Sequence, residues 1–274
     1  MELNELLASR TALPSIPRVV ALLLTELDRD EPDLRRVGQL VSTDPALTAR
    51  MLQLANSAYF QLARRIGGVS EALAILGMEH VRSLVAGAAL GTTFKSVPGM
   101  NMQQFWRYSL DVAKLSRLLA GIVKLNQNAA FTTGLLHAVG ELVMHLGMHA
   151  EMVQLNEAMP PLDLRRAKAE QRAFGYCYAQ VSAGFAREWQ FPESIVDALE
   201  YQTAPFEEDA YEPLAGVVHL ATWRARAREA RLDEKEMAVT FPDVVGLALT
   251  LDIDMVLQQE PIDWTSGQEA SQFA

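Results

Sequence analysis

Apolar residues recur every three or four positions along most of the chain, which is the spacing of amphipathic α-helices. Residues 16–30 are typical, because Val19, Leu22, Leu23 and Leu27 form a stripe along one side of the helix they predict. The chain has no evenly spaced alternating runs and no Asn-Gly or Asp-Gly pair, which are the usual signals of strands and hairpins. The pattern therefore predicts an all-α fold.

Capping and breaking residues mark where the helices begin and end. Asp33 and Asp44 precede helical runs as N-caps, and Pro45 takes the first turn, where its missing N–H costs nothing. Gly77 ends a short helix. The helices expected from these signals span residues 16–30, 33–44, 44–60, 70–77, 78–94, 103–125, 128–147, 159–175, 178–191, 192–202 and 214–232, with short elements at 241–253 and 254–260.

The segment 96–101 is the strongest internal boundary, because it combines proline, glycine and asparagine. It predicts a two-lobe helical bundle, with an N-terminal lobe over residues 1–97 and a C-terminal lobe over 98–260. Residues 261–274 lack periodicity and are expected to form a loose tail.

Composition narrows the class of protein. Of the 274 residues 50% are apolar and 21% are charged, so a large core can form, and the formal net charge of −10 opposes binding to nucleic acid or anionic lipid. The single cysteine, Cys177, excludes a disulfide within the chain and favours a cytoplasmic location. The uncharged runs are too short and too polar to cross a bilayer, so no membrane association is expected.

Spacing alone gives a weak metal motif. His137, Glu141, His145 and His149 follow one another at intervals of four residues. Along a helix, each interval of four residues rotates the side-chain direction by about 40° and moves it about 6 Å along the axis. Adjacent members could share one ion, whereas three on a straight helix cannot converge on it. Ordinary core or surface histidines are therefore favoured over metal ligands.

Other chemistry-bearing motifs are missing or weak. The chain has no Gly-x-Ser-x-Gly elbow and no glycine-rich phosphate loop, and Cys177 is expected to be a buried thiol without a catalytic role. The basic run at 224–231 is interpreted as a solvated helix face. Phe105, Trp106 and Tyr108 are expected in or around the core.

Several motifs together resemble the HDOD family, the HD-related output domain of bacterial signalling proteins. They are the proline-spaced opening at 13–24, the Asp-Pro-Ala-Leu and Ala-Asn-Ser motifs within 41–60, and the Ala-Ile-Leu-Gly and Val-Arg motifs within 68–85. The second lobe continues the resemblance over 105–120, 131–142, 187–202 and 217–223, so that it covers roughly residues 10–230.

HDOD domains resemble HD phosphohydrolases, in which His and Asp side chains on facing helices hold divalent ions that activate water. The resemblance implies that these ligand positions are degenerate here. Of the expected ligand residues only His137 is present. Ala138 stands where the Asp after it is expected, and Thr222 stands where a further Asp is expected. Tyr108 and Tyr178 occupy two positions at which His is expected. Tyr201 with Gln202 replaces the remaining His-rich position. We expect no catalytic residues, no metal and no cofactor, and a vestigial pocket formed by Tyr108, His137, Ala138, Tyr178, Tyr201 and Thr222.

The resemblance implies a non-catalytic regulatory or adaptor module that acts through protein contacts. Its expected partners are signalling proteins such as a sensor kinase, a response regulator or a cyclic-di-GMP enzyme. Two alternatives remain open at this point. One is a divergent metal phosphohydrolase that uses His137 with Glu141, Glu200 or His219. The other is a nucleotide or nucleic-acid sensor that binds without cleavage in a pocket lined by Tyr108, Tyr178 and Tyr201.

Overall fold

The computed structural model describes residues 1–8, 17–29, 31–91, 97–206 and 212–259. The expected all-α class is confirmed, because the described residues form helices and no strand. The helices are α1 Leu3–Ala8, α2 Pro17–Leu27, α3 Leu34–Val41, α4 Pro45–Ala55, α5 Val69–Gly91, α6 Met102–Ile122, α7 Gln127–Leu136, α8 Val139–Gly147, α9 His149–Ala158, α10 Arg166–Phe174, α11 Tyr178–Glu188, α12 Glu193–Tyr201, α13 Pro213–Glu229, α14 Glu234–Thr240, α15 Asp243–Leu249 and α16 Ile253–Leu257. The tail expected at 261–274 lies outside the described residues.

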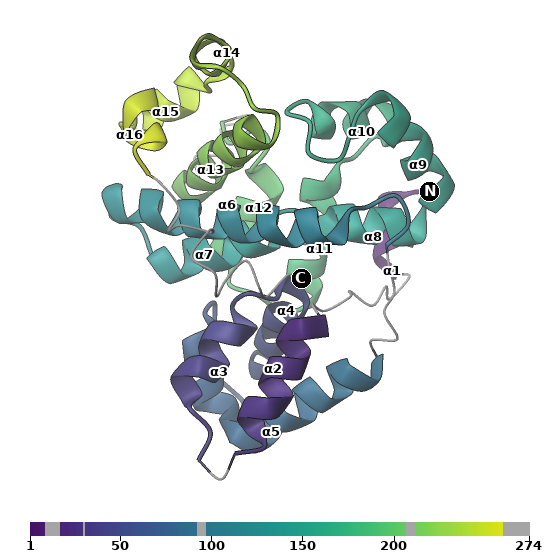
Figure 1. Cartoon of the computed structure of the whole chain (residues 1–274), viewed down its shortest axis with the longest axis vertical. Coiled ribbons are helices and arrows are strands. Elements are labelled where there is room, and N and C mark those ends of the chain that lie inside the picture. Colours follow the sequence, from purple (N-terminus) through teal and green to yellow (C-terminus); the bar gives the residue numbers. More distant parts are fainter. Residues whose placement is uncertain (9–16, 30, 92–96, 207–211, 260–274) are drawn as a thin grey trace.

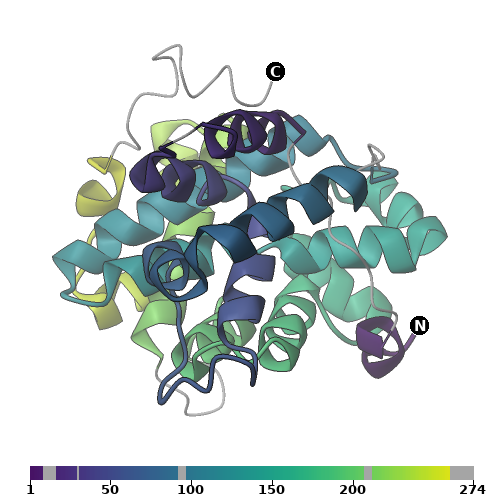
Figure 2. The same ribbon diagram turned by 90° about the horizontal axis from the view of Figure 1, so that it is seen from below.

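The helices form two groups along the long axis of the molecule. Helices α2–α5 make up the lower group and α6–α16 the upper group (Figure 1). In the view from below, α5 lies nearest and crosses the helices of the upper group (Figure 2). One continuous hydrophobic cluster joins the groups, and the Thr132 hydroxyl of α7 donates to the Gly67 carbonyl at 2.8 Å. Helix α1 packs against α8 and α11, so it joins the upper group although it opens the chain.

Local sequence signals account for several helix ends. The Asp33 carboxylate accepts from the amides of Arg35 and Arg36, and the Asp44 carboxylate accepts from the Leu47 amide at 2.9 Å, so both expected N-caps are confirmed. At Gly77 the backbone leaves helical geometry with φ +66°, and the helical segments on either side meet at a kink. Positive φ is a conformation that glycine adopts without strain.

The helix expected over 128–147 is wrong as a single element. It is divided at His137 and Ala138 into α7 and α8. The break leaves the His137 carbonyl outside the helical ladder, where it accepts from the Ser182 hydroxyl at 3.1 Å and from the Gln202 amide at 3.0 Å. These side chains satisfy a polar group that would otherwise be buried without a partner. Helices α1, α9 and α14 were not expected, and none of them is longer than ten residues.

The stretch Gln127–Gly147 is the one helical segment among the described residues that passes a length and hydropathy test for crossing a membrane. Of its apolar window, 83% is buried inside the protein. The same test is passed by core helices, and this stretch packs on α6, α11, α12 and α13.

Two glycines allow the central helices to approach closely. A Cβ on Gly134 would lie 2.8 Å from the Ala113 Cα of α6, and a Cβ on Gly140 would lie 2.1 Å from the Tyr178 carbonyl of α11. Both distances are too short for a real side chain, so these positions require glycine. The close packing brings α6, α7, α8, α11 and α13 together around His137.

Candidate functional site

His137 is buried at the end of α7 and uses both ring nitrogens in hydrogen bonds. Its Nδ1 lies 2.7 Å from the Gly134 carbonyl oxygen, which can only accept, so Nδ1 carries the proton. Its Nε2 lies 2.9 Å from the Tyr108 hydroxyl, so that nitrogen accepts and the hydroxyl donates. The lone pair through which this imidazole would bind a metal is therefore occupied by the phenol of α6.

Arg226 of α13 completes the chain of hydrogen bonds. Its Nε donates to the Tyr108 oxygen at 2.9 Å, and one terminal nitrogen donates to the Asp163 carbonyl at 3.0 Å. The guanidinium carbon also lies 5.3 Å from the centre of the Tyr178 ring, within the range of a cation–π contact. A permanent positive charge thus lies among Tyr108, His137 and Tyr178, which are positions where the family resemblance implies metal ligands.

The interpretation of residues 224–231 as a solvated helix face is wrong for Arg226, which is only 3% exposed. A signal was present in the sequence. Arg226 follows Thr222 by four residues, and this spacing places both on the same side of α13. Arg224 is half-buried and Arg228 is exposed, so these two arginines fit the predicted solvated helix face better than Arg226 does.

Burial and the guanidinium keep the site in one protonation state. Burial, together with the nearby Arg226 charge, lowers the pKa of His137 to about 3, so the imidazole is neutral across the physiological range. Burial likewise raises the pKa of Tyr108 and of Tyr178, although Arg226 opposes the rise in each case. The phenols are therefore neutral hydrogen-bonding groups.

A second buried network lies next to this chain of hydrogen bonds. Arg166 is fully buried, and its Nε lies 3.1 Å from Glu141 and 2.8 Å from Glu170. Glu170 in turn accepts from the backbone amide of Tyr178 at 2.8 Å. One buried guanidinium thus contacts two buried carboxyl groups, and the Glu141 carboxylate also interacts electrostatically with Arg226. Burial raises the pKa of Glu170 well above its usual range, and the adjacent Glu141 carboxylate raises it further.

The remaining vestigial positions surround His137 less tightly. Ala138 is buried at the helix break, whereas Tyr201 and Thr222 are half-buried. The side-chain amide of Gln202, next to Tyr201, donates to the His137 carbonyl, and the backbone carbonyl of Gln202 accepts from His219 Nδ1 at 2.7 Å. Since Tyr108, His137, Ala138 and Tyr178 are at most 1% exposed, a ligand would have to open the site to contact them.

The carboxylates offered as alternative ligands are engaged elsewhere. Glu141 pairs with Arg166, and Glu200 pairs with Arg187 at 2.6 Å on the surface. His145 lies within the same network as Glu141, with its Nε2 3.1 Å from the Asn156 amide nitrogen, and His149 is exposed at the start of α9. No group of three or more His, Cys, Asp or Glu side chains that could hold a metal ion is found in the part of the chain that the structure describes.

The donor set at His137 does not fit a divalent ion. It offers one imidazole whose lone pair is occupied, neutral phenols, an alanine and a buried guanidinium. Divalent ions need several oxygen, nitrogen or thiolate donors, and carboxylates supply the negative charge that offsets the charge of the ion. A fixed cation at the centre adds electrostatic repulsion to this shortage.

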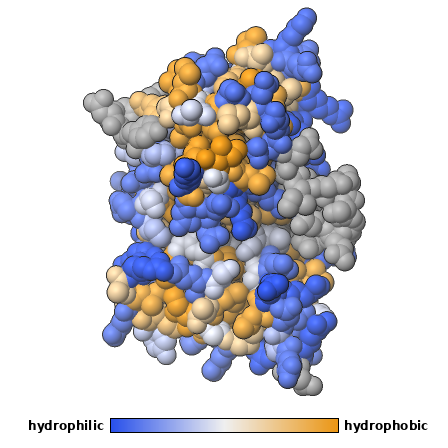
Figure 3. Space-filling view, turned by 90° about the vertical axis from the view of Figure 1, so that its left-hand side faces the viewer, coloured by the Kyte–Doolittle hydropathy of each residue, from blue (hydrophilic) through white to orange (hydrophobic). Residues whose placement is uncertain are grey.

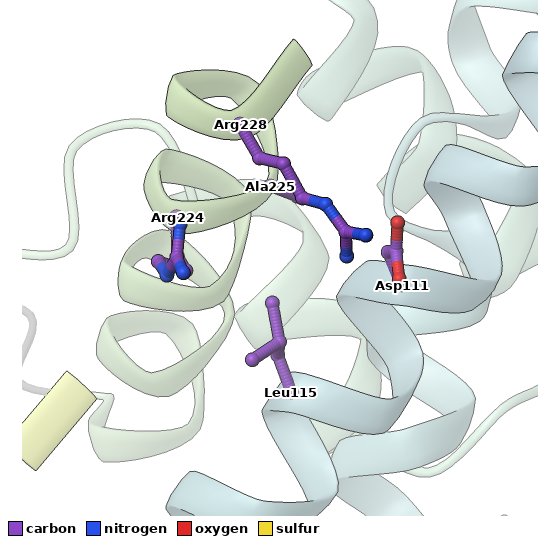
Figure 4. Close-up of a pocket in the computed structure, with 5 residues that line it drawn as sticks. All are labelled: Asp111, Leu115, Arg224, Ala225 and Arg228. Atoms are coloured by element: carbon purple, nitrogen blue, oxygen red, sulfur yellow. The ribbon is translucent and has the colours of Figure 1, made fainter. Parts of the chain in front are cut away.

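A small pocket lies between α6 and α13, beyond Tyr108 in the direction of the C-terminal end of α6. It is lined by Asp111, Leu115, Arg224, Ala225 and Arg228, and it has room for about one water molecule (Figure 4). The Arg228 side chain points across it toward Asp111. The buried Asp111 Oδ1 has no hydrogen-bond partner among the described residues, and burial raises the pKa of this carboxyl to about 6. The pocket is too small for a nucleotide.

Comparisons with known proteins agree with this fold. The family model of the HDOD domain matches residues 13–205. The crystal structure of the MmoQ response regulator of Methylococcus capsulatus str. Bath aligns with 91% of this chain and 98% of its own, at a TM-score of 0.71 and 23% identity. An HDOD domain protein with unknown function from Geobacter sulfurreducens aligns over 93% of this chain and 90% of its own, at a TM-score of 0.50 and 26% identity.

The similarity to curated sequences is partial. An uncharacterized protein of Treponema pallidum (strain Nichols) is 22% identical over 220 residues, which are 78% of this chain and 42% of that protein. The chain therefore spans less than half the length of this relative.

Proposed function

This chain belongs to the HDOD family, and from that premise we propose that it is a non-catalytic module of bacterial signal transduction that acts through protein contacts. Its partners are signalling proteins such as a sensor kinase, a response regulator or an enzyme of cyclic-di-GMP turnover. The response regulator MmoQ, which shares its fold, supports a role of this kind. The single, buried Cys177 supports a cytoplasmic location.

The observation that carries the proposal is the chain of hydrogen bonds from Arg226 through Tyr108 to His137. Hydrolysis in the HD manner needs a cation that lowers the pKa of a bound water, together with a base that handles the proton. Here the imidazole is kept neutral with its lone pair engaged, and the guanidinium cannot act as the base, because it donates hydrogen bonds and accepts none. Losing several ligands should cost far more than the roughly 10–100-fold loss that follows removal of one supporting group around a metal.

The test measures metal content and turnover on the same purified protein. The chain is prepared with Mn²⁺, Fe²⁺ or Mg²⁺ in excess, desalted and analysed for bound metal, then assayed with cyclic di-GMP and with simple phosphodiesters. We expect metal far below one equivalent and hydrolysis no faster than in a His137→Gln control. One equivalent of retained metal, together with turnover that the control loses, would refute the proposal.

The positive half of the proposal needs a partner. The tagged chain is recovered from its own cell after brief cross-linking, and the cross-linked residues of both proteins are identified. A signalling protein linked to a defined surface supports the proposal. Recovery of a cleaved nucleotide product with no linked protein would contradict it.

A further inference from the structure

Helices α14, α15 and α16 carry apolar side chains that face solvent on the outer side of α13. Val239 is 86% exposed, Val244 is 70% exposed and Leu247 is 81% exposed, and Met255 on α16 is also exposed. Val244 and Leu247 are three residues apart on α15, so they share one face of that helix. Figure 3 shows this side of the molecule, where apolar and hydrophilic side chains alternate at the level of α15 and α16.

These exposed residues are not needed to anchor the helices. Val245 and Leu249 form the buried face of α15, which packs on α13. The Phe241 ring makes an edge contact with Trp223 of α13, with ring centres 5.1 Å apart. Helix α15 is therefore apolar on two faces, of which the fold uses one. Side chains as large as these, exposed together on one small element, are typical of an interaction site.

The helices that carry these apolar residues also carry exposed acidic residues. Helices α14–α16 and their caps contain six exposed acidic side chains and one lysine, Lys235. The ion pairs found among the described residues involve none of these carboxylates. The acidic residues are Asp233, Glu234, Glu236, Asp243, Asp252 and Asp254. This concentration of negative charge repels anionic lipid and nucleic acid, and it attracts a positively charged partner.

We propose that this surface, formed by Val239, Val244, Leu247 and Met255 with the exposed acidic residues of the same helices as its acidic rim, docks a basic amphipathic helix of a partner protein. The partner helix presents apolar residues at i, i+3, i+4 and i+7 to α15 and places lysine or arginine side chains against the acidic rim. The inference rests on the proposed function, because it assigns the protein contact through which the module acts.

The probe is a synthetic peptide of about four helical turns, with leucines at i, i+3, i+4 and i+7 and lysines at the flanking positions. A second peptide carries glutamate in place of every lysine. Binding to the full chain is measured by calorimetry, and the contact is mapped by hydrogen exchange. We expect only the lysine peptide to bind, with protection confined to residues 234–257 and affinity that falls as salt is raised.

Two variants of the surface and one matched control separate this site from general attraction to an acidic protein. Leu247→Asp removes the apolar centre, and Asp254→Lys reverses one charge of the rim. Both residues are exposed, so each variant should keep the fold. Leu247→Asp should weaken binding by about tenfold or more, and Asp254→Lys should weaken it severalfold. Leu34→Asp alters an apolar residue of α3 that is 56% exposed, and it should leave binding unchanged.

Equal binding by the chain and by Leu247→Asp, or no binding of the lysine peptide, would overturn the inference. Binding to anionic vesicles that Leu247→Asp abolishes would assign the surface to a membrane instead. A dimer of the free chain that Leu247→Asp dissociates would assign it to a second copy, and either result overturns the proposal. Failure here leaves the proposed function standing, since metal content and turnover are measured independently.

Discussion

Replacing Tyr108 with phenylalanine removes a single oxygen atom from the centre of the site. That oxygen accepts from Arg226 Nε at 2.9 Å and donates to His137 Nε2 at 2.9 Å. Phenylalanine fills almost the same volume, so the substitution creates no significant cavity. Tyr108→Phe therefore isolates the hydrogen bonds from the packing.

The expected cost follows from the two groups left without a partner. Both Arg226 and His137 are buried, so water cannot readily replace the hydroxyl. Leaving a buried donor or acceptor unsatisfied costs about 1–3 kcal/mol, and more when the group is charged. We expect Tyr108→Phe to lower the free energy of unfolding by about 3 kcal/mol. In an Arg226→Met background only the His137 acceptor is left, so the same change should cost about 1–2 kcal/mol.

The assay is urea denaturation of the four proteins of this double-mutant cycle, with Tyr59→Phe as a control. Tyr59 is 75% exposed, and its substitution should change stability by no more than about 0.5 kcal/mol. A cost below about 1 kcal/mol for Tyr108→Phe, or the same cost with and without Arg226, would show that Tyr108 is not the bridge described. A tyrosine that only lined an open ligand pocket would give that result.

Three further predictions concern single residues. Burial raises the pKa of Asp111 to about 6, so the folded chain holds the carboxyl proton more tightly than the unfolded chain does. The free energy of unfolding therefore falls by up to about 3 kcal/mol as the pH rises from about 4 to 6. Asp111→Asn should therefore stabilise the chain in urea at pH 7.5 and have little effect at pH 4.5; a constant difference contradicts this. Gly140→Ala would push a Cβ against the Tyr178 carbonyl and should lower the unfolding midpoint sharply, whereas an unchanged midpoint contradicts the close approach. Asp44→Ala removes the N-cap on the Leu47 amide and should cost about 1 kcal/mol in the same assay, with an unchanged value as the contrary result.

The parts of the fold that could be predicted are those encoded by neighbouring residues. The N-caps at Asp33 and Asp44 and the break at Gly77 depend on a side chain or a missing side chain acting within one helical turn. The division at His137 could not be read this way, because nothing in the local pattern interrupts the apolar run. The carbonyl freed there is satisfied by Ser182 and Gln202, which lie far along the chain.

The candidate site shows the same limit more sharply. The resemblance to the HDOD family implied which metal-ligand positions carry other residues, since each of these is visible at one position in the sequence. It did not indicate what fills their place, because a charged residue is expected on the surface unless a distant group stabilises it when buried. The groups that do so for Arg226 are the Tyr108 hydroxyl, the Tyr178 ring and the Asp163 carbonyl, and none lies within 40 residues of it.

Burying an arginine and losing metal ligands are linked by electrostatics. Among the described residues, the Arg166 guanidinium contacts the two buried carboxyl groups, Glu141 and Glu170. Although burial opposes it, the Glu141 carboxylate also raises the pKa of Arg226, so it stabilises the positive charge of that residue without contacting it. A buried negative charge needs a compensating cation, and a guanidinium that belongs to the chain supplies it without depending on ligand occupancy. We infer that Arg226 keeps the scaffold folded and closed where an HD enzyme would rely on its ions. Because this charge balance needs no bound metal, it supports the proposal that the module acts through protein contacts on its surface.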